Sequence, residues 1–522
     1  MDDSWSRNIQ ALKDRYRMDP VNAAWYLVGR HDPTRTALIW RDVQARTLPL
    51  DYGELSDQSA RWAARLDRLG IGPGDRVAGL LPKRPELLLV ALATWRLGAV
   101  YVPLFTAFGS DAVAYRVQRS RARVVITDRA NRAKVPALPE VSVLDVDEPM
   151  QDLPPLDIWR PCRPQDPMIL LYTSGTTGQP KGVPVPIWAL AAFEAYMRWG
   201  LDLRPDDRFW NLADPGWAYG LYYGMMGPLL LGQATFWYGG SFDAAVVVDL
   251  LERQGITNFA AAPTAFRAIR AQGLKLPTTL RALSSAGEPL NPEVIRWAEE
   301  TAGRPIRDHY GQTELGMVIN NHQAPELERP LKLGSMGQAM PGFRAVVLDD
   351  AGHEVGPGTE GHIAIDIPAS PLFWFSGYEG DPSDAESRLS PDGRYYLTGD
   401  DGSRDEDGYF FFTGRSDDVI LSAGYRIGPF EVESTLMAHP AVAECAVVGV
   451  PDELRGQAVR AYVVVRPGVT PYATLADELK EWVRTRLAKT HYPREIIVVP
   501  SLPKTPSGKI QRFLLRNRED PS

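Results

Sequence analysis

The sequence predicts an α/β protein built around a largely parallel sheet, and two observations support this prediction. Short apolar runs typical of buried strands, such as residues 76–81 and 167–172, alternate with segments of helical periodicity over the first three-quarters of the chain. Strand–helix alternation of this kind is typical of α/β layers. The chain also has 522 residues, which is too many for one compact core, so we expect at least two domains.

The predicted elements follow one another in a regular order. Strands are expected at residues 76–81, 123–127, 167–172, 256–262 and 280–286. Helices are expected at residues 85–97 and 292–301, and a further helix follows the strand at 256–262 and ends at residue 272. From about residue 332 to 412, glycines, prolines and short β-like runs predict a small β-rich subdomain. Ligands of parallel sheets bind at loops beyond the carboxyl ends of the strands, so we expect the functional residues in those loops.

The pattern changes after Gly414. A hairpin at 419–426, a helix at 430–438, strands at 445–450 and 459–465 and a helix at 474–489 predict a compact α+β unit. About a hundred residues is a normal domain size. We therefore divide the chain into an N-terminal domain, residues 1–416, and a C-terminal domain, residues 417–522.

Composition excludes several classes of protein. With 44% hydrophobic and 23% charged residues the chain is not mostly disordered, and no apolar run reaches the ~18 residues of a membrane span. The acidic N-terminus lacks a signal-peptide core. Cys162 and Cys445 suggest neither a zinc site nor a disulfide, and we expect both to be buried in a reducing, cytoplasmic protein. The net charge of −8 argues against nucleic-acid binding.

The charge is uneven along the chain. Residues 480–518 contain ten Lys/Arg against two Asp/Glu. This segment is either a solvated helix followed by a basic tail or a surface for a ligand that carries phosphate.

The string YTSGTTGQPKGV at residues 172–183 is the sharpest chemical signal. Its hydroxyls, glycines and lysine suit a loop that cradles phosphate oxygens, and it lacks the spacing of a Walker loop. The residues proposed to contact phosphate here are Thr173, Ser174, Gly175, Thr176, Thr177, Gly178 and Lys181, of which Lys181 either touches the phosphates or only orders the loop.

This string resembles the phosphate loop of the adenylate-forming superfamily, which includes acyl-CoA synthetases, peptide-synthetase adenylation domains and beetle luciferases. Further motifs of that superfamily occur in order: SAGEP at 285–289, YGQTE at 310–314, LTGD at 397–400, GRSDDVI at 414–420, SAGYRIGP at 422–429 and PKTPSGKIQR at 503–512. The resemblance covers the chain from about residue 30 to its end. The residues of these motifs, and of FSGY at 375–378, are most similar to those of the medium-chain acyl-CoA synthetases and their acetyl-CoA synthetase relatives.

The resemblance implies both a fold and an activity. The fold would be a large N-terminal domain of layered α/β subdomains plus a β-barrel-like subdomain, with a small mobile α+β C-terminal domain. The activity would use ATP, Mg²⁺ and CoA: a carboxylate attacks the α-phosphate, pyrophosphate leaves, and a thiol takes the acyl group from acyl-AMP. The first step gathers negative charge at phosphorus, so it needs preorganised cations.

The resemblance also assigns roles to single residues. Lys509 matches the catalytic lysine that bridges the carboxylate and the α-phosphate. Arg426 is expected to reach the α-phosphate or the carboxylate. Glu314 matches the Mg²⁺-associated carboxylate, as hard oxygen ligands suit Mg²⁺, and Thr313 a phosphate contact. The remaining nucleotide contacts are Gly287, Glu288 and Pro289 along the adenine, Tyr310 on its face, Gly311 and Gln312 beside it, Asp400 at the ribose, and Arg415 at the ribose or the phosphates.

Two further residues are linked to domain rotation. Asp417 matches the hinge about which the C-terminal domain turns between the half-reactions. Gly424 would line the passage for pantetheine, and the basic stretch 480–518 would then face the CoA phosphates. The chain departs from its relatives in PVPI at 184–187, where many carry a histidine, and in AKTHYP at 488–493, near the expected CoA surface.

The acyl pocket is predicted from Trp217, Ala218, Tyr219, Ala286 and Gly311. Acetyl-CoA synthetases have a tryptophan in place of Gly311 and a larger residue in place of Ala286, so both differences predict a larger cavity here. We expect a monocarboxylic acid larger than propionate, and we expect any side chain placed at 311 to project towards the acyl group.

Two other functions compete with an acid–CoA ligase. One is an acyl-AMP ligase that delivers its product to a carrier-protein phosphopantetheine or an amine. The other is a catalytically silent binding protein on the same fold, which the intact Lys509, Glu314, Asp400 and Arg415 argue against. Oligomeric state, monomer or homodimer, is open at this point.

Overall fold

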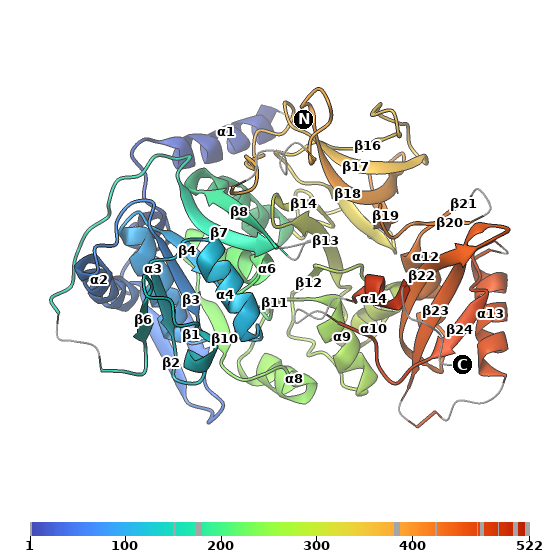
Figure 1. Cartoon of the computed structure of the whole chain (residues 1–522), viewed down its shortest axis with the longest axis horizontal. Helices are drawn as coiled ribbons and strands as arrows, with labels where there is room; N and C mark the ends of the chain where they lie inside the picture. Colours follow the sequence, from blue (N-terminus) through green and yellow to red (C-terminus); the bar gives the residue numbers. More distant parts are fainter. Residues whose placement is uncertain are drawn as a thin grey trace.

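The structure, a computed structural model, describes residues 3–149, 153–173, 180–380, 387–422, 425–466, 468–469, 474–488, 490–504 and 510–516. It is a mixed α/β protein with a large N-terminal part and a smaller C-terminal part, which lies at the right in Figure 1. Its strands form three sheets. The predicted fold class is confirmed.

The first sheet has the strand order β6-β5-β3-β4-β7-β8. Its strands are β3 (Arg76–Leu80), β4 (Val100–Pro103), β5 (Val124–Thr127), β6 (Ser142–Asp145), β7 (Pro167–Thr173) and β8 (Lys181–Pro186). All neighbours are parallel except β7 and β8, which form an antiparallel pair. The helices that precede or connect these strands are α2 (Tyr52–Arg68), α3 (Pro85–Arg96) and α4 (Ser110–Arg119).

The second sheet contains the centre of the molecule, with the order β16-β17-β18-β19-β15-β14-β13-β12-β11-β9-β10-β1-β2. Its first seven strands in the chain are β1 (Thr36–Arg41), β2 (Thr47–Asp51), β9 (Phe209–Asn211), β10 (Thr235–Tyr238), β11 (Asn258–Ala261), β12 (Ala282–Ala286) and β13 (Arg307–Gln312). The helices α8 (Ala244–Arg253), α9 (Pro263–Ala271) and α10 (Pro292–Ala302) enclose an apolar core on one side.

The opposite side of this sheet is covered by a tightly packed helical layer. Its elements are α1 (Asp3–Arg17), η1 (Trp25–Gly29), η3 (Ile187–Ala189), α5 (Leu190–Ala195), η4 (Tyr196–Gly200), α6 (Ala218–Gly220), η5 (Leu221–Met226) and α7 (Gly227–Leu230). Large apolar side chains of α5, η4 and η5 belong to the main core, which also includes β13 neighbours such as Ala286 and Met317. The short turn η2 (Arg132–Lys134) lies elsewhere, after β5.

The predicted β-rich stretch forms the antiparallel end of the second sheet. It comprises β14 (Gly316–Asn320), β15 (Ser335–Ala339), β16 (Ala345–Leu348), β17 (Glu360–Asp366), β18 (Tyr395–Arg404) and β19 (Phe410–Arg415). These strands curve away at the upper right of Figure 1. Because β15 pairs with β14, they continue the large sheet instead of standing apart from it.

The C-terminal part has its own sheet of five strands: β20 (Ile420–Ser422), β21 (Tyr425–Ile427), β22 (Val442–Asp452), β23 (Gly456–Val465) and β24 (Glu495–Val498). The helices α12 (Pro429–Met437), α13 (Leu475–Arg486) and α14 (Arg512–Arg516) complete it. The chain passes from the second sheet to this one between Arg415 and Ile420, the segment in which the predicted boundary at 416/417 lies.

The two parts touch along α12. Phe430 packs edge-on against Phe412 of β19, with ring centroids 6.4 Å apart. Asn291, the residue before α10, donates from Nδ2 to Ser434 Oγ at 3.1 Å. These contacts define one arrangement of the C-terminal part on the N-terminal part.

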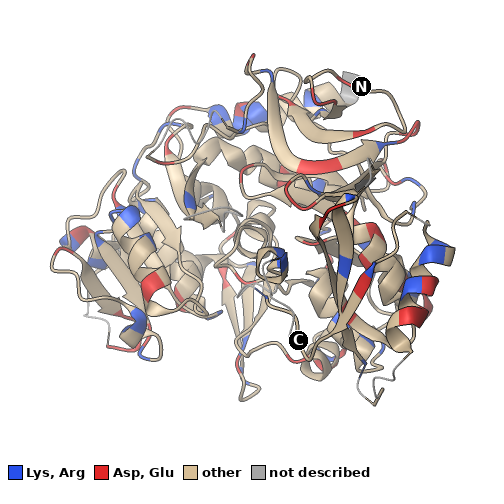
Figure 2. Cartoon of the chain, turned by 45° about the vertical axis from the view of Figure 1, so that its right-hand side comes forward, with Lys and Arg blue, Asp and Glu red and all other residues tan. Residues whose placement is uncertain are grey.

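The predicted basic stretch is not a uniform cationic surface. Five of its described cations pair with carboxylates: Lys480, Arg484, Lys504, Arg512 and Arg516. Figure 2 shows both charge signs interspersed over the cartoon. Cys162 and Cys445 are buried and unpaired, as expected. None of the helices in the described ranges combines the length and apolar character that crossing a bilayer requires.

Candidate active site

The phosphate loop is framed by β7 and β8. Thr173 and Lys181 are register partners at the ends of these strands, and Thr173 Oγ1 donates to Lys181 O at 3.4 Å. Residues 174–179 between them lie outside the described residues, so the predicted contacts of Ser174, Gly175, Thr176, Thr177 and Gly178 stay predictions. Lys181 Nζ lies 5.3 Å from the centroid of the Tyr378 ring.

Glu314 lies in the turn between β13 and β14 and is only 5% exposed. Its Oε1 accepts a hydrogen bond from Tyr378 Oη at 2.7 Å, and Arg388 Nε donates to the same tyrosine oxygen at 3.3 Å. Burial and the Glu314 carboxylate hold the pKa of Tyr378 above its ordinary value, so the hydroxyl is a donor at neutral pH. Tyr222 Oη donates to Thr313 O at 3.2 Å and fixes the turn.

The chemistry of this turn fits a magnesium ion that is bound mainly by phosphates. The ion usually takes one or two carboxylates and completes its shell with substrate phosphates and water. No group of three or more His, Cys, Asp or Glu suited to a metal occurs among the described residues. Glu314 is therefore the one predicted metal ligand, and Tyr378 is its only hydrogen-bond partner in the described part of the chain.

Asp400, at 4% exposure on β18, is the centre of a second network. Its Oδ2 accepts from Tyr310 Oη at 2.5 Å and from Gln312 Nε2 at 2.8 Å. Its Oδ1 accepts from Arg415 at 3.0 Å. The network thus joins β13, β18 and β19, and burial together with the Asp400 carboxylate raises the pKa of Tyr310 well above its ordinary value.

This network retains one unused donor. Arg415 Nε is buried and has no hydrogen-bond partner among the described residues. A buried N–H group without a partner is costly, and a ligand oxygen would relieve that cost. Arg415 and Asp400 thus offer a donor and a carboxylate next to the aromatic ring of Tyr310, as a nucleoside requires.

The predicted adenine segment follows β12. Gly287 has φ +98° with open space around its Cα, so this turn favours glycine. Glu288 accepts from Thr264 Oγ1 at 2.8 Å and from Arg267 at 2.5 Å. These bonds fix the segment on α9, whereas contacts of Glu288 and Pro289 with adenine remain predictions.

The residues predicted to line the acyl pocket divide between two places: Ala286 and Tyr219 lie near β12 and β13, and Trp217 packs in a separate apolar cluster. Ala286 and His309 are register partners in neighbouring strands. Tyr219 and Ala218 belong to α6, and Tyr219 Oη lies 3.2 Å from Tyr196 Oη, which is 2.6 Å from His309 Nδ1. Trp217 packs against Phe105 and Phe108, and its buried indole Nε1 has no partner among the described residues.

Gly311 corrects one expectation. A Cβ added there would lie 2.1 Å from Gly316 O and 2.7 Å from Met317 Cα, both backbone atoms of β14. The cause is an irregularity in the β13–β14 pairing between Tyr310 and Gly311, which brings the two backbones close. The expectation that any side chain at 311 projects towards the acyl group is wrong for this backbone.

Several predicted residues stay predictions. Lys509 and Gly424 lie outside the described residues, and the Arg426 side chain is not described. The loop that carries Lys509 is bounded by Lys504 and Ile510, which form an antiparallel bridge. At the predicted hinge, Arg516 donates to Asp417 O at 2.9 Å and pairs with Asp418, so α14 is attached to the linker.

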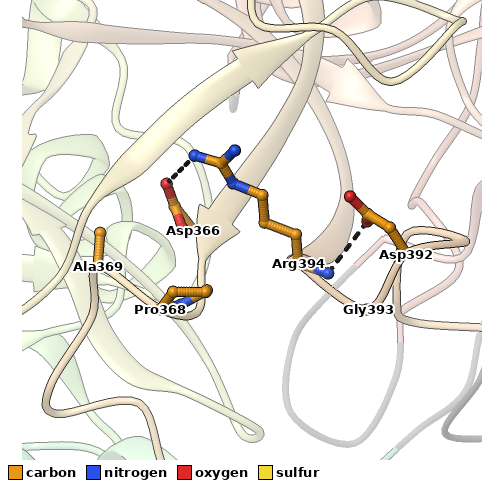
Figure 3. Close-up of a pocket in the computed structure, with 6 residues that line it drawn as sticks. All are labelled: Asp366, Pro368, Ala369, Asp392, Gly393 and Arg394. Atoms are coloured by element: carbon orange, nitrogen blue, oxygen red, sulfur yellow. Dashed lines mark hydrogen bonds and ion pairs between the residues drawn. The ribbon is translucent and has the colours of Figure 1, made fainter.

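Sequence reasoning missed Tyr378, Arg388 and Tyr196 as parts of the site. Tyr378 enters the sequence argument only as part of the FSGY motif, and it lies 64 residues from Glu314, in the segment between β17 and β18, so no local pattern links the two. A different hollow, formed by Asp366, Asp392 and Arg394 among others, lies on β17 and β18 (Figure 3). Arg394 pairs there with Asp366 at 3.1 Å, and none of its residues belongs to the networks above.

Comparison with known proteins gives the family. The model of the AMP-binding enzyme family matches residues 27–378, and that of the AMP-binding enzyme C-terminal domain matches residues 431–509. The chain belongs to the AMP-binding enzyme family. The resemblance to adenylate-forming enzymes is therefore confirmed.

Three relatives match between 93% and 95% of this AMP-binding enzyme. It is 37% identical to acetyl-coenzyme A synthetase of Bacillus subtilis, over 95% of this chain and 90% of that protein. It is 35% identical to human mitochondrial acyl-coenzyme A synthetase ACSM4, over 93% of this chain and 87% of that protein. The crystal structure of Brucella canis acyl-CoA synthetase is 49% identical, covers 95% of this chain and 94% of that one, and has a TM-score of 0.73.

One pair of structures bears on the arrangement of the two parts. MatB from Rhodopseudomonas palustris gives a TM-score of 0.84 in its ATP-bound form and 0.74 in its apo form, at 28% and 29% identity. The first comparison covers 95% of this chain and 98% of MatB, the second 96% and 98%. The overall structure of this AMP-binding enzyme is thus more similar to the ATP-bound form.

Proposed function

We propose that this AMP-binding enzyme activates a monocarboxylic acid larger than propionate as acyl-AMP and transfers the acyl group to CoA. The enzyme is an AMP-forming acyl-CoA synthetase and uses ATP, Mg²⁺ and CoA, as its relatives do. The size of the acid and the roles of single residues are the parts that we add.

One observation carries the proposal. Contacts link Lys181 to Tyr378 and Tyr378 to Glu314, which lies in the turn directly after β13. On β13 itself, Gln312 and Tyr310 contact Asp400 of β18. The residues assigned to phosphate, metal and ribose thus meet around the carboxyl end of β13, in the order that a nucleoside triphosphate requires. We assign Tyr310 to adenine, Asp400 and Arg415 to ribose, and Lys181 and Thr313 to the phosphates.

The chemical step needs positive charge where the carboxylate meets the α-phosphate. A bound Mg²⁺ neutralises developing phosphate charge. We assign Glu314, oriented by Tyr378, to hold it, and Lys509 to bridge the attacking carboxylate and the α-phosphate. Because preorganised charges act most strongly where water is excluded, the buried position of Glu314 supports this role.

The proposed acid size rests on one small residue, Ala286, where the acetyl-CoA synthetase relatives are expected to carry a larger one. Ala286 is buried at 1% exposure, so its methyl group is the whole of what this position contributes to the predicted pocket. Gly311 adds nothing to this argument, because a side chain there would meet the backbone of β14. Acetate must be tested beside longer acids, because an acetyl-coenzyme A synthetase is among the relatives.

The test is a pyrophosphate-release screen over acids from acetate to octanoate, each with and without CoA. We expect acid-dependent release of pyrophosphate, formation of AMP and acyl-CoA with CoA present, and higher kcat/KM for acids longer than propionate. Release of ADP in place of AMP, or no acid-dependent release, would overturn the activity. Highest kcat/KM with acetate would overturn the acid size alone.

The acceptor and the compartment are also proposals. Free CoA is favoured by the relatives, and a carrier-protein phosphopantetheine or an amine is the alternative, decided by running both acceptors in parallel with purified acyl-AMP. We place the enzyme in the cytoplasm, because both cysteines are unpaired.

A further inference from the structure

A chain of hydrogen bonds runs from the protein interior to the predicted acyl pocket. His309 Nε2 lies 3.2 Å from Asn321 O, His309 Nδ1 lies 2.6 Å from Tyr196 Oη, and Tyr196 Oη lies 3.2 Å from Tyr219 Oη. His309 and Tyr196 are buried at 2% and 0% exposure, whereas Tyr219 is partly exposed. Tyr219 is therefore the end of the chain that a ligand can reach.

The chain has only one consistent direction. Asn321 O is a carbonyl and can only accept, so His309 Nε2 carries the hydrogen. Burial lowers the pKa of His309 to about 3, which leaves the ring neutral and Nδ1 an acceptor. Tyr196 must then donate to Nδ1, and its oxygen accepts the hydroxyl hydrogen of Tyr219.

The direction determines what Tyr219 offers to a ligand. Its single hydrogen is already donated to Tyr196, so its oxygen presents only acceptor lone pairs. The ring packs against Tyr223, whose hydroxyl accepts from Met317 N at 2.9 Å, opposite Gly311 on the neighbouring strand. The acceptor therefore lies among the residues that are predicted to surround the acyl group.

A second polar group on this face lacks a partner. Asn320 pairs directly with His309 across β13 and β14, so both side chains are on the same face of the sheet. Asn320 is fully buried, and neither Nδ2 nor Oδ1 has a hydrogen-bond partner among the described residues. An unsubstituted hydrocarbon tail would leave the Tyr219 oxygen without a donor.

We propose that the enzyme selects acids whose acyl chain carries a hydroxyl group, because Tyr219 accepts a hydrogen bond from that hydroxyl. Tyr196 and His309 are positioning residues that hold Tyr219 as an acceptor. This inference rests on the proposed function, since it refines the acid class of the same site. A site that hydrogen-bonds a substrate hydroxyl rejects the analogue without it by large factors, and the partial exposure of Tyr219 reduces the factor here.

The test compares matched acids of one chain length: the unsubstituted acid, its hydroxy derivatives and its keto derivatives. Wild-type kcat/KM is expected to be at least about tenfold higher for the best hydroxy acid than for the unsubstituted acid, as one added hydrogen bond allows. The keto acid offers only acceptors and gains nothing. A ratio near one for every hydroxy position overturns the inference and leaves acyl-CoA synthesis intact.

Two variants separate direct from positioning roles. Tyr219→Phe is expected to reduce the hydroxy-to-unsubstituted ratio to about one. Tyr196→Phe frees the Tyr219 hydroxyl to donate, so the keto acid is expected to gain relative to the unsubstituted acid, which a loss of packing alone would not cause. Tyr409→Phe is the matched control, because its hydroxyl donates to Pro330 O and takes no part in the chain of hydrogen bonds that ends at Tyr219, so its ratio should equal that of wild type.

Binding provides a measurement independent of turnover. Hydroxyacyl and unsubstituted acyl sulfamoyl-adenosines, which mimic acyl-AMP, are titrated calorimetrically against wild type and each variant that melts cooperatively. Tighter binding of the hydroxyacyl analogue supports the inference even if a variant is inactive. Equal binding overturns it. If no acid is activated and neither analogue binds, the proposed function itself fails.

Discussion

At the scale of single residues, the site is built from side chains that are held by one another before any ligand binds. Tyr378 orients Glu314, and Tyr310, Gln312 and Arg415 surround Asp400. The motifs identified Glu314 and Asp400 from their sequence context. They did not identify Tyr378, because hydrogen bonds between distant strands leave no local pattern.

Replacing Asp400 should weaken ATP binding. Asp400→Asn removes the charge that pairs with Arg415 and replaces one acceptor oxygen by a donor, so about 1.5–3 kcal/mol of binding is expected to be lost. This corresponds to a rise in KM for ATP of about ten- to a hundredfold. The matched control is Asp405→Asn, which breaks the ion pair with Lys332 in the same sheet. An unchanged KM for ATP would contradict the ribose assignment.

Tyr378→Phe should raise the Mg²⁺ requirement. The variant leaves Glu314 without its hydrogen-bond donor, and loss of such a partner typically costs ten- to a hundredfold in metal affinity or activity. We expect the Mg²⁺ concentration for half-maximal rate to rise by about tenfold. Tyr395→Phe removes a comparable bond, to Glu354 Oε1 at 2.9 Å, outside the site and should leave this concentration unchanged. If both variants raised the Mg²⁺ concentration for half-maximal rate equally, Tyr378 would have only a structural role.

Stability should fall below about pH 6.5 because two buried histidines stay neutral in the folded state. Burial lowers the pKa of His309 to about 3 and that of His322 to about 4, whereas each takes up a proton near pH 6.5 when unfolded. The two histidines therefore leave the free energy of unfolding unchanged above pH 6.5. As the pH falls from 6.5 towards 4, each lowers this free energy by about 1.4 kcal/mol per pH unit. Urea unfolding from pH 7 to 4.5 measures this, with His309→Gln expected to flatten the slope.

At the scale of elements, the order of strands and helices was accessible from the sequence, and the local pairing was not. Apolar periodicity and flanking glycines located β3, α3, β12 and α10 to within about two residues. The irregular pairing between β13 and β14 depends on the backbone alone. For that reason the sequence predicted the wrong environment for Gly311.

Gly311→Ala is consequently expected to destabilise the protein. Its Cβ would meet backbone atoms that cannot move without shifting β14, and overpacking of this kind costs about 1–3 kcal/mol. A fall in Tm of several degrees is expected by differential scanning calorimetry, on the order of 2–4 °C per kcal/mol. Gly356→Ala, at a glycine with open space and no positive φ, is the control and should leave Tm unchanged. Equal Tm values for the two variants would contradict the close approach of the β13 and β14 backbones at Gly311.

At the scale of the whole molecule, the C-terminal part rests on the N-terminal part through contacts of α12. Phe430 packs on Phe412 and Asn291 bonds Ser434, and the linker between the sheets is short. Interfaces between the domains of one chain commonly permit relative motion of those domains. The predicted rotation about Asp417 would change these contacts between the half-reactions.

Two substitutions should separate the half-reactions. Lys509→Ala is expected to abolish acid-dependent pyrophosphate release and largely spare thioester formation from supplied acyl-AMP, because only adenylation places a carboxylate against the α-phosphate. Gly424→Leu is expected to do the reverse by obstructing pantetheine. Pyrophosphate exchange and acyl-CoA yield measure the two steps. Parallel losses in both steps for either variant would refute its assignment.

The alternation of side chains along β13 has a consequence for how this enzyme can diversify. Tyr310 and Gln312 turn to one face of the strand, towards Asp400, while His309 turns to the other, towards Tyr196. Successive residues of a strand point to opposite faces. Under the proposed assignments, the nucleotide contacts and the hydrogen bonds for acid recognition therefore lie on opposite faces of one peptide segment. Substitutions on the His309 face are then expected to change the choice of acid and leave the ATP-binding face as it is, whereas a one-residue deletion in β13 is expected to exchange the two faces and abolish both.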